Sequence, residues 1–412
     1  MGKQLSNFMG IFNNKKPTLK SGVVDFGYLD SRELYFDSAC QTLRPQPVID
    51  AMTEYFQGYN ACGGRVKYDW GKKVDEKILE TRKQILALLG KSDSEYVVAF
   101  TLNTSYGINL VLSQLPSKFK KVVTSEIEHN SVFLPAMEAA KRLGVFRVVL
   151  PRSPDGALEY KPAHLSEAVI VLNSMSNIDG RALVNLQAIV RDAHQAGGIV
   201  LIDAAQGIGH DQELLRRSDF DALFFSGHKF YGPSLGVIVI KRSLLKALDV
   251  RFIGGGMVED VKKETYKLVS SDEDLPALLE IGLQDFAGII GLGASIKWHE
   301  SYKPEGQDRQ VHQAALSRLL FERLAEMPTV RLINFTPSPI VSFYSEKIDA
   351  HRLAIYLSAQ NIMARSGYFC CHYYLKNLKK YPPLLRVSLG LHNTRQQAES
   401  FLQTLETIIL NA

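Results

Sequence analysis

The stretch GIVLIDAAQGIGHDQELLRRSDFDALFFSGHK (residues 198–229) contains two short apolar runs, each of which stops at polar residues. The first run ends on Asp203, and the second is followed by His228 and Lys229. Short apolar runs separated by a helix-length segment are typical of parallel strands in an α/β protein. The carboxyl ends of such strands lie at one edge of the sheet, where ligands bind. We therefore expect the three polar residues to share a site.

The same alternation continues through the middle of the chain and predicts a doubly wound domain. Amphipathic segments such as 130–143 and 184–196 separate the apolar runs and have the periodicity of helices. The expected strands are 96–100, 121–126, 146–150, 168–173, 198–203, 221–226 and 236–241. The fold class is therefore α/β, with a mostly parallel seven-stranded sheet that is flanked by helices.

After about residue 300 the pattern changes to that of a smaller α+β C-terminal domain. Amphipathic segments near 307–326, at 349–360 and from Thr394 predict helices, and short apolar runs between them predict strands. The predicted divisions are 1–30, 31–299 and 300–412. The middle division is the large domain, the last is the small domain, and we expect the N-terminal segment to pack with the small domain.

The composition is typical of a soluble globular protein. The net charge of +5 is mild for 412 residues, and the basic clusters are short, so we expect no nucleic-acid partner. No stretch approaches the roughly 20 apolar residues that cross a bilayer, and we expect no membrane association. The four cysteines lack C-x-x-C spacing, which predicts neither a disulfide framework nor a metal site. These features favour a cytoplasmic protein.

Two residues at the strand ends suit the chemistry of a charged aromatic aldehyde. Lys229 can form a Schiff base if burial lowers the pKa of its amine. Asp203 can keep a pyridine nitrogen protonated, which makes the ring an electron sink. Together they predict a site for pyridoxal 5'-phosphate.

Other polar residues complete this predicted set. His129 can stack on the ring, and Gln206 can donate a hydrogen bond to its phenolic oxygen. Thr104 and Ser105 lie where a strand turns into a helix, and hydroxyl and N–H groups at a helix start bind phosphate. Helix capping alone would also explain these two hydroxyl residues.

The order of these residues resembles the class V aminotransferase group of fold type I pyridoxal-phosphate enzymes, nearest to the cysteine desulfurases and selenocysteine lyases. The run IDAAQ (202–206), followed by SGHKFYGPSLG (226–236), carries the resemblance. Further matching stretches are YFDSACQTLRPQPVIDAM (35–52), NTSYGINLVL (103–112), SEIEHNS (125–131), SNIDG (176–180), GIIGLGASI (288–296), RSGYFCC (365–371) and LLRVSLGLHNT (384–394). Because these motifs occur in order over nearly the whole chain, the resemblance is specific.

The resemblance implies a role for each site residue. Lys229 would form the Schiff base, Asp203 would pair with the pyridine nitrogen, and His129 would stack on the ring and move protons. Gln206 and Asn177 would contact the ring oxygen or the substrate. The residues implied to hold the phosphate are Thr104, Ser105, Ser226 and His228. The residues implied to bind the substrate are Arg386, whose guanidinium would pair with the carboxylate, Arg365 and Asn177.

The resemblance also implies a reaction and partners. In the run R-S/T-G-x-x-C, Cys370 follows Arg365 by five positions and would be the nucleophile that takes sulfur from L-cysteine, leaving L-alanine and a persulfide. Family members are homodimers whose sites lie at the interface. A sulfur-acceptor protein is a further partner that this reaction implies.

Several alternatives stay open on the sequence alone. Tyr68 stands where the family often has a histidine, and Leu283 stands where it often has a threonine. These departures favour a C–S β-lyase, an aminotransferase or an epimerase on the same cofactor. A non-catalytic scaffold that binds a partner protein is the alternative from another class. Free cysteines are commonly buried as small apolar groups, which is the competing interpretation of Cys370 and the expected role of Cys40 and Cys62.

Overall fold

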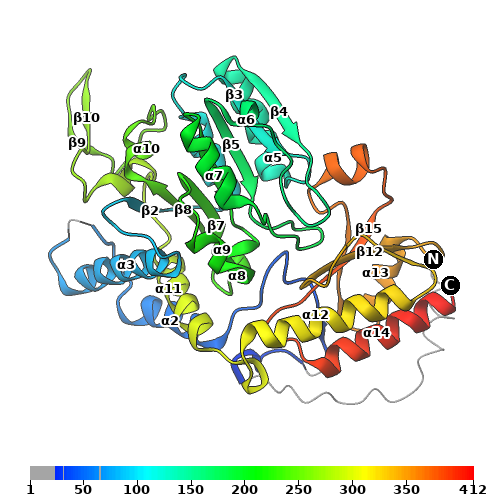
Figure 1. Cartoon of the computed structure of the whole chain (residues 1–412). Helices are drawn as coiled ribbons and strands as arrows, with labels where there is room; N and C mark the ends of the chain where they lie inside the picture. Colours follow the sequence, from blue (N-terminus) through cyan, green and yellow to red (C-terminus); the bar gives the residue numbers. More distant parts are fainter. Residues whose placement is uncertain (1–23, 31, 65) are drawn as a thin grey trace.

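The computed structural model describes residues 24–30, 32–64 and 66–412, and a seven-stranded sheet forms the centre of the large domain (Figure 1). In spatial order the strands are β2 (Tyr96–Thr101), β8 (Gly236–Lys241), β7 (Ala222–Ser226), β6 (Ile199–Asp203), β5 (Ala168–Asn173), β3 (Lys121–Ser125) and β4 (Phe146–Leu150). Strand β8 is antiparallel to both of its neighbours, and the other pairs are parallel. The predicted mostly parallel sheet is therefore confirmed.

The central strands are buried on both faces, because their sequences are almost continuously apolar. One face packs against α3 (Asp69–Leu88), α7 (Leu186–Gln195) and α11 (Phe286–Ser301). The opposite face packs against α4 (Thr104–Ser113) and α5 (Asn130–Leu143). The two resulting cores hold the sheet rigid, so residues at the strand ends have fixed positions.

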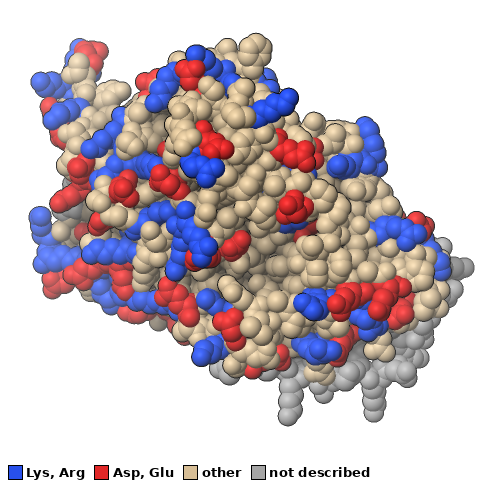
Figure 2. All heavy atoms as spheres, in the orientation of Figure 1, with Lys and Arg blue, Asp and Glu red and all other residues tan. Residues whose placement is uncertain are grey.

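The small domain is built on a four-stranded antiparallel sheet. Its spatial order is β11 (Val330–Leu332), β12 (Ile340–Ser345), β15 (Leu384–Ser388) and β14 (Arg365–Gly367). It packs with α12 (Arg309–Glu326), α13 (Ala350–Ser358) and α14 (Arg395–Leu410) around a separate apolar core. Basic and acidic side chains are interspersed on the face that Figure 2 shows, including over α12 and α14, where Arg323 lies 3.9 Å from Glu406.

The start of the described chain crosses between the two domains. Strand β1 (Leu34–Tyr35) pairs with β13 (Ile362–Met363), and Asp37 forms a backbone bridge with Ser388. The side chains of Leu34 and Phe36 belong to the small-domain core. The sequence placed these residues in the large domain, whereas in the structure they pack with the small-domain core. The domain boundaries themselves stay a prediction.

The predicted N-terminal segment of residues 1–30 is only partly described. Its residues 1–23 lie outside the described residues. The ring of Phe26 lies 5.7 Å from that of Trp298 in the large domain and 5.5 Å from that of His392 in the small domain. This part of the segment therefore contacts both domains.

The remaining elements connect these layers. The strands β9 (Val258–Val261) and β10 (Tyr266–Leu268) form a hairpin that projects from the large domain (Figure 1). Helix α2 (Gln46–Gly58) packs on α11. The short helical elements are η2 (Val24–Phe26), α6 (Pro162–Leu165), α8 (Gly207–His210), α9 (Gln212–Arg216), η3 (Gly227–Lys229), α10 (Arg242–Lys246), η4 (Leu275–Leu278), η5 (Pro304–Gly306) and the π-helix η6 (Tyr373–Leu378). None of the described helices is both long and apolar enough to span a bilayer.

Candidate active site

A cavity of about 400 Å³ lies where the carboxyl ends of the central strands meet the small domain. Every site residue that the sequence predicted lines this cavity. The residues are Thr104, Ser105, His129, Asn177, Asp203, Gln206, Ser226, His228, Lys229, Arg365, Cys370 and Arg386. The fold therefore brings together polar residues that are spread over nearly 300 positions of the sequence.

Asp203 is the last residue of β6, and Lys229 lies three residues after the adjacent parallel strand β7. Burial lowers the pKa of the Lys229 ammonium; the Asp203 carboxylate opposes this shift, and the Arg386 guanidinium adds to it. Burial also raises the pKa of Asp203, although the backbone N–H of Ala205 donates to its Oδ1 at 2.9 Å. The downward shift of the Lys229 pKa increases the share of the neutral amine, which is the form that attacks an aldehyde.

Hydroxyl groups gather at the N-terminus of α4. The backbone N–H of Thr104 donates to Ser226 Oγ at 2.9 Å, and the hydroxyl oxygens of these residues lie 2.6 Å apart. Ser105 Oγ lies 2.5 Å from Ser131 Oγ. The N-terminus of a helix attracts anions, and these hydroxyl groups can donate hydrogen bonds to the oxygens of a phosphate. The chemistry of this end of the cavity therefore fits the phosphate of pyridoxal 5'-phosphate.

His129 precedes α5 and caps its first turn. Its Nδ1 accepts a hydrogen bond from the backbone N–H of Ser131 at 3.0 Å, so the neutral ring carries its proton on Nε2. Burial lowers the pKa of His129 to about 3, and the positive charges of Lys229 and Arg386 add to the shift. The ring is therefore uncharged at neutral pH and suited to stacking on an aromatic ligand.

Gln206 and His228 contact the segment that follows β1. Gln206 Nε2 donates to the carbonyl of Ala39 at 2.7 Å, which leaves its second amide N–H free. The carbonyl of His228 accepts from the backbone N–H of Thr42 at 2.8 Å. Burial lowers the pKa of the His228 ring to about 4, with Lys229 and Arg44 adding to the shift. Both side chains therefore enter the cavity as neutral groups.

Cys370 lies on a loop with an unusual backbone. Phe369 and Cys370 have left-handed φ angles of 47° and 57°, which residues other than glycine rarely adopt. The ring of Phe369 is buried 4.7 Å from the Arg386 guanidinium, whereas Cys370 is exposed and lines the cavity. The competing interpretation of Cys370 as a buried apolar group is therefore wrong.

Cys371, and not Cys370, has the buried environment of a structural cysteine. Its thiol is buried and donates to Asn177 Oδ1 at 3.2 Å. Burial raises the pKa of Cys371, and the carboxylate of Glu128 adds to the shift. The thiol of Cys371 therefore stays protonated, while its position supports the loop that carries Cys370.

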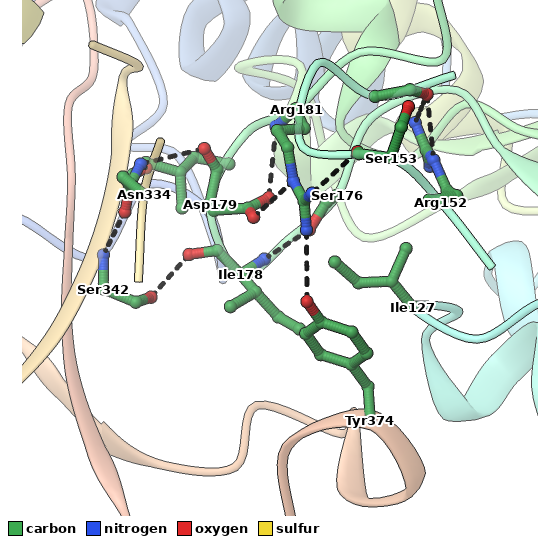
Figure 3. Close-up of polar contacts among 12 residues, drawn as sticks. Ile127, Arg152, Ser153, Ser176, Ile178, Asp179, Arg181, Asn334, Ser342 and Tyr374 are labelled. Atoms are coloured by element: carbon green, nitrogen blue, oxygen red, sulfur yellow. Dashed lines mark hydrogen bonds and ion pairs between the residues drawn. The ribbon is translucent and has the colours of Figure 1, made fainter. Parts of the chain in front are cut away.

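A polar network around Asp179 and Arg181, close in sequence to Asn177, links the two domains (Figure 3). Arg181 Nε donates to Asp179 Oδ2 at 2.7 Å, and its Nη2 lies 3.3 Å from the hydroxyl oxygen of Tyr374. Asn334 Nδ2 donates to the carbonyl of Asp179 at 2.9 Å. The network ties the loop after β5 to the small domain, because Tyr374 and Asn334 both belong to that domain.

The amide of Asn177 then holds the Cys370 loop directly. Its Nδ2 donates to the carbonyl of Phe369 at 2.8 Å, and its Oδ1 accepts from the thiol of Cys371. The sequence predicted that Asn177 contacts the cofactor ring or the substrate. In the structure its polar atoms support the loop, and one N–H of the amide remains for a ligand.

Arg386 and Arg365 meet at a carboxylate that the sequence analysis missed. Arg386 Nη2 donates to Asp37 Oδ1 at 3.1 Å, and Arg365 Nε donates to Asp37 Oδ2 at 2.9 Å. Arg386 Nη1 donates to the carbonyl of Asn177 at 3.0 Å. An acidic residue directly after an apolar pair in YFDSAC was the only signal for Asp37. Its contacts could not be foreseen, because Arg386 lies about 350 residues further along the chain.

The comparisons with known proteins agree with this site. A family model described as aminotransferase class V matches residues 34–401. The chain belongs to the aminotransferase class V family. The resemblance inferred from the sequence motifs is thereby confirmed, together with the fold type I assignment.

The relatives of this class V chain include probable cysteine desulfurases of Methanothermobacter thermautotrophicus and Pyrococcus abyssi. They are 33% and 31% identical to it; the matches cover 91% and 92% of this chain and 94% and 95% of the relatives. The apo structure of a cysteine desulfurase from Thermococcus onnurineus NA1 has a TM-score of 0.84 at 29% identity and covers 93% of this chain and 96% of its own. The Escherichia coli cysteine desulfurase CsdA, in an S-sulfonic acid form, has a TM-score of 0.81 at 25% identity, with 94% and 97% covered.

Two further features of this class V site were not foreseen. Cys40, expected to be structural, lines the cavity and is therefore a second thiol within it. Glu128 lies beneath the cavity, where burial raises its pKa to about 7. Its carboxylate accepts from Ser125 Oγ at 2.6 Å and from the backbone N–H of Asn173 at 2.8 Å. Asn173 lines the cavity, so Glu128 supports the floor of the site.

The two residues that depart from the family pattern lie on the surface. The exposed fraction of Tyr68 is 54% and that of Leu283 is 77%. Neither residue lines the cavity. Within the described ranges, no three His, Cys, Asp or Glu side chains are grouped as they are around a metal ion. The departures therefore lie outside the cavity lining of this chain.

Proposed function

We propose that the protein is a pyridoxal-phosphate-dependent cysteine desulfurase. The reaction would take sulfur from L-cysteine, leaving L-alanine and a persulfide on Cys370. The observation that carries the proposal is the exposed thiol of Cys370 in the same cavity as Lys229 and Asp203. The relatives named as probable cysteine desulfurases support it.

The residues of the cavity suit each part of the cofactor. Lys229 would bind it covalently, Asp203 would hold the proton of the pyridine nitrogen, and His129 would lie against the ring. The residues that would hold its phosphate are Thr104, Ser105, Ser226 and His228. When bound, pyridoxal 5'-phosphate supplies an electron-withdrawing ring that stabilises negative charge on the substrate carbon atoms.

Residues of the small domain would position the substrate and accept its sulfur. The guanidinium of Arg386, supported by Arg365, would bind the carboxylate of L-cysteine. The thiolate of Cys370 would attack the substrate sulfur, forming a sulfur–sulfur bond as the carbon–sulfur bond breaks. The electron pair of the broken bond would stay on carbon, which then takes a proton to give L-alanine. Lys229 and His129 are the groups in the cavity that can carry this proton.

Product analysis with L-cysteine tests the reaction. A desulfurase yields L-alanine and sulfane sulfur, whereas a C–S β-lyase yields pyruvate. We expect Cys370→Ser to abolish sulfur transfer and to leave the visible absorbance of the bound cofactor intact. Cys371→Ser is the matched control, because its thiol is buried beside the same loop. Pyruvate as the main product, or undiminished turnover of Cys370→Ser, would contradict the proposal.

The same proposal includes a homodimer. Exposed apolar side chains surround a shallow pocket beside the start of α4, among them Leu102, Tyr106 and Leu283, with exposed fractions of 70%, 39% and 77%. Apolar groups that gather on a surface indicate a protein interface. We expect light scattering to give twice the chain mass and Leu283→Glu to shift the protein toward monomer. A wild-type monomer at micromolar concentration would contradict the homodimer.

A sulfur-acceptor protein is the partner that this function requires. The loop of Cys370 continues into η6, whose neighbourhood exposes Lys376, Lys379 and Lys380. Such a basic surface beside the persulfide would suit an acidic acceptor. A cytoplasmic location and the absence of nucleic-acid and membrane partners stay predictions from the sequence.

A further inference from the structure

The carboxylate of Asp37 joins the two arginines that face the substrate end of the cavity. Arg365 Nη2 lies 2.8 Å from Asp37 Oδ2, and Arg386 Nη2 lies 3.1 Å from Asp37 Oδ1. The exposed fractions of the three side chains are 45% for Arg365, 3% for Arg386 and 14% for Asp37. The pair of Asp37 and Arg386 is therefore buried and held in place, whereas the guanidinium of Arg365 is exposed to solvent.

The fold places the two arginines directly opposite each other. Strands β14 and β15 are antiparallel neighbours, and Arg365 is the register partner of Arg386. Like charges in this position destabilise a strand pair. Asp37 reaches them because its own backbone bridges to Ser388, two residues beyond Arg386. The carboxylate thus compensates a repulsion that the strand register creates.

The charges at this end of the cavity leave one positive charge for a ligand. Both arginines stay protonated, and Asp37 contributes one negative charge between them. The imidazole of His129, whose titration Arg386 affects, is neutral at pH 7 because its pKa is lowered to about 3. One carboxylate of a ligand therefore neutralises the remaining positive charge, and a second anionic group would leave the site with a net negative charge.

The N–H groups of Arg386 agree with this count of charges. Arg386 uses Nη1 for the carbonyl of Asn177 and Nη2 for Asp37, while its buried Nε has no partner among the described residues. An unpaired buried donor is costly unless a ligand completes it. Asp37 and Asn177 each take one N–H of Arg386, so they orient the guanidinium and leave its other N–H groups for a carboxylate.

We propose that Asp37 is a specificity-determining residue, which makes the cavity select amino acids with one carboxylate and reject those with a second anionic group. Its carboxylate orients Arg386, neutralises one of the two guanidinium charges and repels an anionic side chain. Without it, two uncompensated guanidinium groups would face the cavity. The inference rests on the proposed function only in taking an α-amino acid as the ligand.

The test is a binding titration of the holoenzyme with L-alanine and L-aspartate, followed by the change in cofactor absorbance. We expect the wild-type protein to bind L-alanine at least tenfold more tightly than L-aspartate. Asp37→Asn, which keeps the shape and removes the charge, should shift the ratio of the two Kd values at least tenfold toward L-aspartate. Asp37→Glu keeps the charge and should keep the ratio within threefold of wild type.

Asp249→Asn is the matched control, because Asp249 forms an exposed pair with Arg251 outside the cavity. Its ratio should equal that of the wild type. A folded Asp37→Asn with an unchanged ratio would overturn the inference, as would a wild-type protein that prefers L-aspartate, a result that needs no variant. The titration requires neither Cys370 nor sulfur removal. Formation of pyruvate from L-cysteine would therefore contradict the desulfurase proposal without altering this result.

Discussion

The two ends of the cavity are built in different ways. The cofactor end consists of residues at the ends of strands, such as Asp203 and Lys229, between two large apolar cores. The sulfur end consists of a loop with left-handed backbone at Phe369 and Cys370, which side-chain hydrogen bonds hold in place. A rigid sheet between two large cores fixes the first end, whereas a small apolar cluster with Phe369 and Cys371 and a few hydrogen bonds fix the second. The difference suits a site in which the cofactor stays and the sulfur leaves.

The largest effect is expected at the cofactor end, from Lys229→Ala. The variant has no amine for the covalent bond to the cofactor, so the visible absorbance band should be lost and turnover should fall about 1,000-fold or more. Absorbance spectroscopy and alanine formation measure the two effects. A variant that keeps the band and its reduction by borohydride would show that Lys229 is not the cofactor lysine.

A smaller effect is expected from Asn177→Ala, which releases the sulfur end. The change removes the hydrogen bond to Phe369 and the acceptor of the Cys371 thiol. Displacing the nucleophile by about 1 Å should lower kcat roughly 10–100-fold, while the affinity for L-alanine stays within a factor of about three. A large loss of L-alanine affinity at unchanged kcat would instead show that Asn177 acts by binding the substrate.

Two glycines sharpen the comparison between the ends. Gly367 has a φ of 127°, and a Cβ there would meet nothing nearer than His351 Cε1 at 3.9 Å, so Gly367→Ala tests backbone strain alone. A cost of about 1–3 kcal/mol is expected, seen as faster hydrogen exchange in the loop. Gly236→Ala tests close packing, because its Cβ would lie 2.4 Å from the Asn103 carbonyl carbon. Gly236→Ala should weaken cofactor binding. Weaker cofactor binding in Gly367→Ala together with faster exchange of the loop in Gly236→Ala would contradict the comparison.

The smallest effect is a pH dependence of stability that comes from His129. Its pKa is lowered to about 3 in the folded protein, so the unfolded chain binds more protons between about pH 6.5 and pH 3. The stabilising contribution is complete above this range and is lost as the pH falls through it. Urea unfolding at pH 7 and pH 5 should show a smaller loss of stability in His129→Gln than in the wild type. An equal loss in both proteins would show that another group is responsible.

The sequence was most informative where function follows from strand ends. The strands that end at Asp203 and Ser226 were predicted to within a residue, and the residues after them line the cavity. Parallel strands make this possible, because the edge of the sheet is known once the strands are known. The antiparallel direction of β8 was not foreseen, since its apolar run has the same pattern in either direction.

What the sequence did not reveal depends on contacts between distant segments. Asp37 meets Arg386 only because a two-residue strand, too short for a periodic pattern, pairs with β13. Cys370 is exposed and Cys371 is buried, in a loop where Phe369 and Cys370 have φ angles that L-residues rarely adopt, and nothing in the letters CC distinguishes the two cysteines. Propensity and periodicity describe neighbouring residues only. They therefore predict neither the contact between Asp37 and Arg386 nor the left-handed backbone at Phe369 and Cys370.

The pairing of β1 with β13 has a consequence for synthesis of the chain. Leu34 leaves the ribosome well before its partner Ile362, and at about 5–20 residues per second the interval is roughly 15–65 s. During that time the large domain can form alone, while β1 waits without its neighbour. Ligand binding then depends on the last step of folding, because Asp37 reaches the two guanidinium groups only when the final quarter of the polypeptide has closed over it.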